Sequence, residues 1–357
     1  MKILITCLAV SLITSLTWSQ DKEAADALVA KGVELHEKAD YQGAIKKYDE
    51  ALALDEFNLF ALAEKAYTQL TLGEAEPCVE NCKLVIAKHP GEEDLKTVYV
   101  TYGNAMDMLK EAEAALRVYD EGIAIFPDFY QLYFNKGITL VGLKNYAEAK
   151  ESFKRSLTYN PEHASSHNAL ARLSHMDKKN IPALLAYARF LAIEPEGERA
   201  ALNLENLKML LTGNAEKTGK NSITINISPE MMADTLADGS PGPDNFMITE
   251  MILSMSSATD FDKKNKKKTE QERFQEKFDL ICSSLSEGQA EHTGFFWEYY
   301  VPYFVEMKEK ELIETFSYIV YASSEDKKVT AWIKENPLAI KAFYTWSNNF
   351  TWSDKLK

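Results

Sequence analysis

The apolar positions of the chain recur every three or four residues over long stretches, which is the spacing of one face of a helix. Between residues 130 and 161 they describe two successive helices and then a proline. The positions that mark this segment are Tyr133, Gly137, Leu140, Tyr146, Ala149, Phe153 and Pro161. Because proline cannot donate a hydrogen bond to the preceding turn, Pro161 predicts the end of the second helix.

The same order of residues returns along the chain at nearly constant spacing. The other copies are marked by Leu28, Gly32, Leu35, Tyr41, Ala44, Tyr48 and Ala51; by Leu62, Ala66, Gly73, Cys78, Cys82 and Pro90; by Tyr99, Gly103, Met106, Ala115, Tyr119, Gly122 and Pro127; and by Leu170, Ala171, Ala183, Tyr187 and Pro195. Pro127, Pro161 and Pro195 lie 34 residues apart, whereas Pro90 and Pro127 lie 37 apart. This difference predicts about three extra residues near residues 91–94. A single helix over residues 199–211 is expected to follow the last copy.

This pattern resembles the tetratricopeptide repeat (TPR), in which a large residue, a glycine, an alanine, an aromatic residue and a proline recur with a period of 34. The resemblance covers roughly residues 24–212. It implies an all-α fold: a TPR α-solenoid of about five helix-pair repeats with a capping helix, followed by a small helical domain. An α-hairpin solenoid of another class is the alternative. The inward faces of such repeats line a concave groove.

The texture of the sequence changes after Gly213. We expect residues 213–245 to be a linker with a short strand or an extended arm at Ser222–Ile227, because apolar residues alternate there. Residues 246–352 are expected to form a C-terminal helical domain. Four helices are predicted there. Their apolar positions are Phe274, Phe278, Ile281 and Leu285; Phe296, Tyr300, Tyr303 and Met307; Leu312, Phe316, Ile319 and Val320; and Ile340, Phe343 and Phe350. A capping box of Thr269 and Glu272 precedes the first helix, Pro302 lies inside the second, and Asn336-Pro337 begins the last. This domain resembles uncharacterised C-terminal regions of exported bacterial TPR proteins.

All four tryptophans beyond the first twenty residues lie in this last region, and residues 295–300 read Phe-Phe-Trp-Glu-Tyr-Tyr. Two interpretations remain open. The aromatic side chains form a bulky core that is partly docked on the repeats, or they form an exposed surface that binds a partner.

The N-terminus has the features of a secretory signal peptide over residues 1–19. Lys2 precedes an apolar run that ends at Leu16, and small residues flank Trp18 before a cleavage site after Ser19. We therefore expect export, to the periplasm or alternatively outside the cell. A membrane-anchored helix and lipidation at Cys7 are the alternatives. No other stretch is apolar enough for an integral membrane span.

Charge and cysteine content narrow the function further. The 40 basic and 54 acidic residues give a formal net charge of −14, which disfavours binding to nucleic acid. The one basic cluster, Lys263, Lys264, Lys266, Lys267 and Lys268, is interpreted as a solvated loop, with lipid or nucleic-acid contact as the alternative. Three cysteines remain beyond the signal peptide, Cys78, Cys82 and Cys282. An odd number of cysteines does not indicate a framework of disulfide bonds. Cys78 and Cys82 are expected to be packing residues, with a redox pair or a metal site as the alternative.

We find no nucleophile elbow, P-loop, dinucleotide fingerprint or zinc-protease motif, so we expect no enzyme activity and no cofactor. His163 and His167 stand four residues apart, a spacing that can hold a metal. However, the repeat places His167 at a packing position and His163 at a turn. We therefore expect no metal site.

The TPR resemblance directs attention to the groove. Its inward positions include Asn104, Phe134, Asn135, Asn168 and Arg172, which we take as the candidate partner-binding residues. Asn104 and Asn135 match the two asparagines with which some TPR domains hold a partner's C-terminal carboxylate. The basic positions of that clamp are Val100, Ser165 and Ala169 here, so its charge contacts are missing. Asparagine can still pair with an extended backbone.

These observations predict a non-catalytic protein–protein interaction scaffold or adaptor in the cell envelope that binds a peptide or helix in the concave TPR groove. Two alternatives remain open: an enzyme with an unrecognised active site in the C-terminal domain, and a structural subunit of an envelope assembly. The oligomeric state and the partner are left open by the sequence.

Overall fold

The computed structural model describes residues 21–212, 215–219, 223–225, 242–262, 265–353 and 356. The predicted signal peptide, with Cys7, lies outside the described residues, as do Lys263 and Lys264 of the basic cluster. The chain divides into two compact units, Met1–Ser152 and Phe153–Lys357. Each unit is described by itself.

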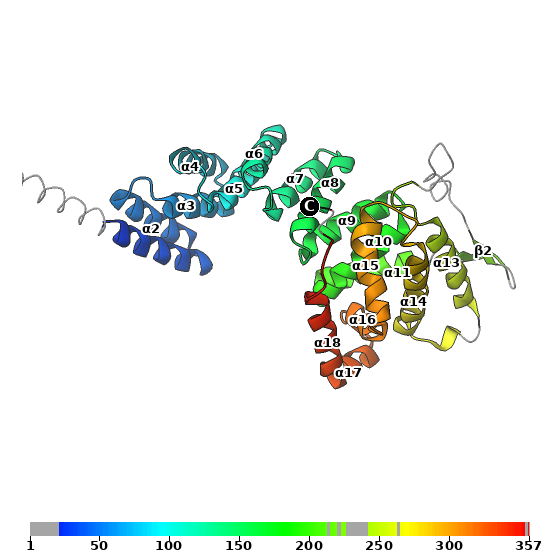
Figure 1. The fold of residues 1–357 in the computed structure, drawn as a ribbon. Helices are drawn as coiled ribbons and strands as arrows, with labels where there is room; N and C mark the ends of the chain where they lie inside the picture. The colour runs from blue at the N-terminus through cyan, green and yellow to red at the C-terminus, as the bar shows by residue number, and fades with distance from the viewer. Residues whose placement is uncertain are drawn as a thin grey trace, which may run out of the picture. The chain divides into compact units, whose positions relative to one another are not determined.

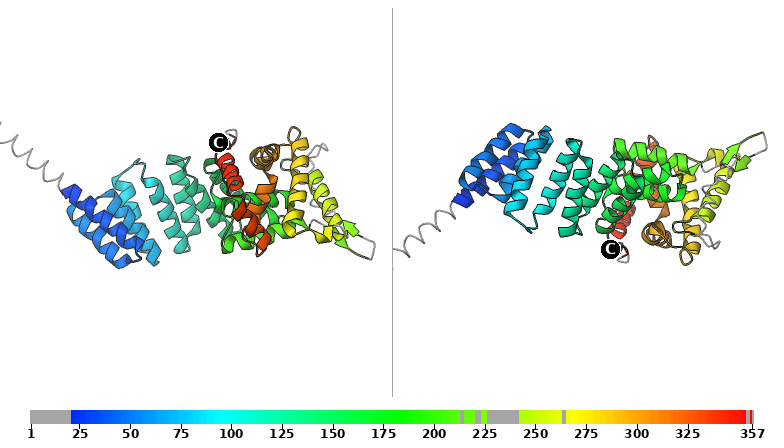
Figure 2. Two further views of the ribbon diagram at one scale, coloured as in Figure 1. Left: turned by 90° about the horizontal axis from the view of Figure 1, so that it is seen from below. Right: turned by 90° about the horizontal axis from the view of Figure 1, so that it is seen from above.

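The first unit is a succession of antiparallel helices of nearly equal length (Figures 1 and 2). After a helix that runs through residues 21–37, the elements are α2 (Tyr41–Leu54), α3 (Leu59–Leu72), α4 (Ala75–Lys88), α5 (Leu95–Met108), α6 (Ala112–Ile125) and α7 (Tyr130–Gly142); α8 (Tyr146–Tyr159) begins in this unit and ends in the next. Each helix from α2 to α7 packs against its neighbour in the chain, and the first helices of successive pairs, α3 with α5 and α5 with α7, also pack together. This double set of contacts is the stacking of helix-pair repeats.

The turns inside the helix pairs repeat as regularly as the helices. Ala39, Gly73, Lys110, Lys144 and Lys178 each have a positive φ between 59° and 80°. Successive members of this series lie 34 residues apart, except for the 37 residues between Gly73 and Lys110. The three additional residues fall between α4 and α5, at residues 89–94, which agrees with the insertion predicted near residues 91–94.

Local signals of the sequence explain where several helices begin. The Asp40 side chain accepts a hydrogen bond from the amide of Gly43 at the start of α2, and Asn58 accepts one from Ala61 at the start of α3. The core between the helices contains the small and aromatic marker residues. Ala66, Cys78, Cys82, Ala115 and Tyr119 are all completely buried. Cys78 and Cys82 therefore lie in the packed core. The hydrogen bond with Cys78, together with burial, raises the pKa of the Cys82 thiol well above its usual value.

The second unit continues with helix pairs and then adds further helices. Its elements are α9 (Ala164–Met176), α10 (Asn180–Ile193), α11 (Glu198–Leu211), β1 (Ala215–Lys217), β2 (Ile223–Ile225), α13 (Met247–Ala258), the short 3-10 helices η1 (Thr259–Phe261) and η2 (Asn265–Lys267), α14 (Glu270–Gly288), α15 (Phe295–Glu309), α16 (Ile313–Val320), α17 (Lys327–Glu335) and α18 (Pro337–Asn348). The two strands pair antiparallel, with Glu216 opposite Thr224. β2 lies in the stretch where alternation indicated a strand or an extended arm.

Helix α10 is the centre of the second unit. Every residue from Ile181 to Ala192 is buried, because α9 and α11 cover part of the helix and α13, α15 and α16 cover the rest. The sequence of this helix is apolar on nearly all sides, which is typical of a helix that is enclosed by protein. The predicted capping helix is α11, and the predicted capping box of Thr269 and Glu272 forms at the start of α14.

The aromatic run at residues 295–300 packs inside the second unit. Phe296, Trp297, Tyr299 and Tyr300 of α15 are at most 5% exposed. The Tyr299 hydroxyl donates a hydrogen bond to the carbonyl of Leu157, at 3.1 Å. Of the two interpretations, the bulky core docked on the repeats is therefore the one that the structure supports, and the exposed aromatic surface was wrong.

The fold is an all-α, TPR-like solenoid with an additional helical region. In the part of the chain that the structure describes, no helix combines the length and the apolar character needed to cross a membrane.

A candidate partner-binding pocket

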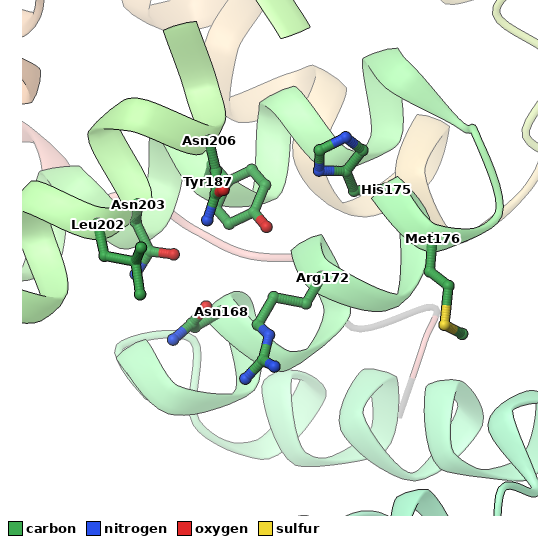
Figure 3. A pocket seen from close by; sticks show the side chains of 8 residues that line it. All are labelled: Asn168, Arg172, His175, Met176, Tyr187, Leu202, Asn203 and Asn206. Carbon is green, nitrogen blue, oxygen red and sulfur yellow. The ribbon is translucent and has the colours of Figure 1, made fainter. Parts of the chain in front are cut away.

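A pocket of about 540 Å³ opens on the second unit between α9 and α11. Figure 3 shows its side chains arranged around Tyr187, which α10 supplies. The lining residues are Asn168, Arg172, His175 and Met176 of α9, Tyr187 of α10, and Leu202, Asn203 and Asn206 of α11. A volume of this size accommodates a few side chains or a small ligand.

Asn168 gives the pocket an unused hydrogen-bond acceptor. Its side-chain oxygen Oδ1 is buried and accepts no hydrogen bond from any described residue. A buried polar atom without a partner costs free energy, since it has lost its water and gained nothing in return. A bound donor, such as a backbone N–H group, would satisfy it.

Arg172 lies one helical turn after Asn168 and is exposed. Within the described residues its guanidinium group makes no ion pair or hydrogen bond. Burial raises the pKa of the Tyr187 hydroxyl, whereas the positive charge of Arg172 lowers it. The charge of Arg172 therefore acts on a group that lines the pocket. The pocket therefore offers a free positive charge beside an unsatisfied acceptor.

Apolar side chains complete the rim. Met176 is 51% exposed and Leu202 is 65% exposed, although both are large and hydrophobic. Exposed apolar groups next to unpaired polar groups are the composition of a binding surface. In contrast, the C-terminal helices pack on α10 and leave these rim residues open.

The opposite side of α9 is held by the C-terminal helices. His167, adjacent to Asn168, is completely buried; its Nδ1 accepts a hydrogen bond from the Tyr300 hydroxyl at 2.7 Å, and its Nε2 donates to the carbonyl of Pro161 at 2.9 Å. Burial and the charge of Arg189 lower the pKa of His167 well below its usual value, so the ring is neutral. Both nitrogen atoms of His167 are used in packing the fold, as the repeat register predicted for this position.

Arg189 fixes α10 in the same region. Its side chain is 1% exposed, it pairs with Glu162, and it donates hydrogen bonds to the hydroxyls of Tyr303 and Ser347 at 3.1 and 3.0 Å. Burial raises the pKa of Glu162, and Arg189 partly counteracts this shift. These contacts position α9 and α10, and therefore the pocket, but do not line it.

The five predicted groove residues fall in both units. Asn168 and Arg172 are brought together in the pocket, whereas Asn104, Phe134 and Asn135 lie in the first unit, on α5 and α7. Asn104 accepts a hydrogen bond from the Tyr119 hydroxyl at 2.8 Å, and Asn135 donates one to the carbonyl of Gln131 at 2.8 Å. Convergence of all five on one wall stays a prediction.

Sequence reasoning missed the contribution of α11 to the pocket. It predicted α11 as a cap, but Leu202, Asn203 and Asn206 form the wall opposite α9. A signal was available, because Leu202 and Asn206 stand 34 residues after Asn168 and Arg172. The capping helix therefore repeats the inward positions of the preceding repeat.

Comparison with known proteins agrees with the period of the helix pairs. The tetratricopeptide repeat profile matches residues 130–163, the segment that contains α7 and α8. The helix pair of α7 and α8 therefore matches a tetratricopeptide repeat. That Asn168, Arg172 and His175 take the inward positions of a further repeat stays a prediction.

Several proteins with TPR repeats are similar to this chain. A TPR repeat-containing protein of Methanocaldococcus jannaschii, MJ1428, is 26% identical over 171 residues, which is 46% of this chain and 30% of that protein. The aligned part thus spans less than a third of that relative. The structure of TTC0263, a TPR protein of Thermus thermophilus, is 24% identical with a TM-score of 0.44 and covers 53% of this chain and 99% of its own. PilF of Pseudomonas aeruginosa is 24% identical with a TM-score of 0.48 and covers 54% of this chain and 84% of its own.

Proposed function

We propose that the protein is a non-catalytic interaction scaffold that binds a segment of a partner protein in the pocket between α9 and α11. One observation carries the proposal. The unsatisfied Oδ1 of Asn168 and the unpaired guanidinium group of Arg172 line the same pocket. TPR helix pairs generally serve as protein-interaction modules. The proposed segment crosses the pocket in extended form, so that one of its backbone N–H groups reaches Asn168.

The chemistry of the pocket specifies what the segment carries. Arg172 selects a carboxylate, for which its planar group offers paired donors. Met176 and Leu202 select an apolar side chain next to that carboxylate, and its burial supplies most of the affinity. Asn104, Phe134 and Asn135 are proposed to contact the same partner from the first unit.

The proposed location is the cell envelope, with the periplasm as the destination of a chain cleaved after Ser19. Sequencing the N-terminus of the exported protein tests this: it should begin at or within a few residues of Gln20, and an intact Met1 would contradict export. An enzyme with its active site in the C-terminal helices is the alternative function. An enzyme requires catalytic side chains that converge in these helices, and we propose no such set among the described residues.

The binding test uses a displayed library of random ten-residue peptides selected on the whole protein. We expect enrichment of Asp or Glu next to Leu, Ile or Phe. Arg172→Ala should weaken the binding of the selected peptides by about 5- to 150-fold, which corresponds to about 1–3 kcal/mol for an interface residue of this kind. Arg117→Ala, which removes an exposed arginine from α6, is the matched control. Equal affinities of the two variants for the acidic peptides would refute the proposal.

A further inference from the structure

Two large aromatic side chains are exposed on one face of α3, in the first unit. Phe60 and Tyr67 are each 49% exposed, and they stand seven residues apart, two helical turns. Glu64 lies between them, four residues after Phe60 and three residues before Tyr67. Residues at this spacing share one face of a helix, so the carboxylate is flanked by the two rings.

The carboxylate of Glu64 has no counter-ion among the residues that the structure describes. The side chain is half-buried, and in the described part of the chain it makes neither a hydrogen bond nor an ion pair. Burial raises its pKa, and only the nearby His36 is available to lower it. A half-buried carboxylate in this position is stabilised if a cation comes to it from outside.

The neighbouring lysines do not serve as that cation. Lys65 pairs with Asp49 at 2.6 Å, and Lys47 pairs with Glu50 at 2.6 Å. The attraction of Glu64 for positive charge is therefore not used within this set of residues.

The ring of Tyr67 is held in place from behind. His36 stacks on it with 5.1 Å between the ring centroids, and Nδ1 of His36 is hydrogen-bonded to the Thr68 hydroxyl at 2.8 Å. Tyr41 packs edge-on against His36, with 5.0 Å between the ring centroids. Because these contacts order Tyr67 in advance, a ligand that uses the ring loses less conformational entropy on binding.

We propose that Phe60, Glu64 and Tyr67 form a binding site for a lysine or arginine side chain of a partner protein. The apolar part of that side chain lies between the two rings, its cationic end contacts a ring face, and the charge pairs with Glu64. This inference rests on the proposed function in so far as the chain binds a protein segment, but it assigns a separate site of opposite charge. The pocket around Arg172 takes an acidic group, and the site on α3 takes a basic one.

The experiment repeats the peptide selection on three forms of the whole protein: wild type, Glu64→Gln and Glu80→Gln. Glu80 is an exposed glutamate on α4, so its replacement removes the same charge from the molecule without touching the α3 face. We expect wild type and Glu80→Gln to enrich peptides with Lys or Arg, and Glu64→Gln to lose this enrichment. Melting curves followed by circular dichroism verify that all three forms are folded.

A double-mutant cycle then assigns the contact. Replacing the enriched Lys or Arg of a selected peptide by Gln should weaken binding to wild type about tenfold and leave binding to Glu64→Gln unchanged. Phe60→Leu and Tyr67→Leu should each reduce the preference for the basic peptide over its Gln form. Failure to enrich basic peptides on wild type, or equal loss in Glu64→Gln and Glu80→Gln, would overturn the inference.

The two proposals fail separately. Loss of the acidic preference in Arg172→Ala concerns only the pocket of the second unit, and loss of the basic preference in Glu64→Gln concerns only α3. If Arg172→Ala leaves the acidic peptides unaffected while Glu64→Gln abolishes basic enrichment, the pocket proposal is wrong and the α3 site stands. The reverse result removes the α3 site alone.

Discussion

Polar residues of the second unit divide into those that the fold satisfies and those that it leaves open. Arg189 is buried, and its two terminal nitrogen atoms bind Glu162 and two hydroxyls, although its Nε has no partner among the described residues. Arg172 is exposed and unpaired among the described residues. His167 is enclosed, but its neighbour Asn168 has a free buried oxygen. Removing a satisfied group should change stability, and removing an open group should change binding.

His167 makes stability depend on pH. Its folded-state pKa lies well below the usual value near 6.5, because burial disfavours the charged ring. Below pH 6.5 the His167 ring is therefore protonated in the unfolded chain but stays neutral in the folded protein. Because the unfolded state binds more protons, the free energy of unfolding falls as the pH falls. His167→Gln removes this one titrating group. The slope of the free energy of unfolding against pH should therefore decrease by at most about 1.4 kcal/mol per pH unit, the value for one proton. Urea unfolding of both forms between pH 4.5 and 7 measures it, and identical slopes would contradict the expectation.

At two glycines of the repeat, Gly32 and Gly103, a tyrosine ring of the next helix occupies the space that a side chain would need. Gly103 of α5 faces the ring of Tyr119 in α6, and a Cβ atom added at Gly103 would overlap that ring. Gly142, at the end of α7, has no atom within 4 Å of such a Cβ. Gly103 and Gly142 therefore differ in packing but undergo the same chemical change when replaced by alanine.

Gly103→Ala should lower the free energy of unfolding by about 1–3 kcal/mol, because Tyr119 must move out of its packed position. Gly142→Ala, the matched control, should leave stability unchanged or raise it by up to about 1 kcal/mol, since alanine favours a helix more than glycine does. Urea unfolding followed by far-ultraviolet circular dichroism compares the two. Equal stabilities would show that Gly103 does not set the distance between α5 and α6.

The sequence predicted the elements that repeat better than those that do not. The 34-residue period located the helix pairs, the extra residues after α4 and the capping helix α11. It did not locate α13 or α17. Four apolar residues of α13, Met247, Ile248, Met251 and Met255, are exposed, so they do not mark a buried face. α17 buries only Val329 and has nine residues, too few for a periodic signal.

The same limit applies to the candidate site. Asn168 and Arg172 were accessible to sequence reasoning because the TPR register fixes which positions of a first helix face inward. The free oxygen of Asn168 and the exposure of Arg172 depend on neighbours from other elements, which no local pattern encodes. Glu64 was missed because an acidic residue in an acidic chain is distinguished only by its burial and its lack of a partner.

For the molecule as a whole, the second unit unites segments that are distant in sequence. Arg189 contacts Tyr303, 114 residues later, and Ser347, 158 residues later. Such contacts leave no periodic trace in the sequence. The sequence did carry an indirect sign of them, because α10 is apolar on nearly all sides, and a helix in the middle of an open solenoid would keep a polar face.

The enclosure of α10 gives a test of the second unit as one folded body. A chain that ends at Asn245 lacks α13 to α18, so α10 loses its outer cover and Arg189 loses Tyr303 and Ser347. An uncovered apolar face and a charged group without its partners both destabilise the helix. We expect the α10 amides to exchange with deuterium at least about tenfold faster than in the full chain, as local opening becomes easier.

Helices α3 to α6 have their core within the first unit, so their exchange should not change in the shortened chain. A chain that ends at Ser353 is the control for shortening itself, because it retains α13 to α18 and should protect α10 as the full chain does. Mass spectrometry of peptic fragments resolves the two regions. If α10 stays equally protected in the chain that ends at Asn245, the C-terminal helices are an appendage and the repeats fold without them. If α10 alone loses protection, the last repeat and its pocket depend on the C-terminal helices for their structure.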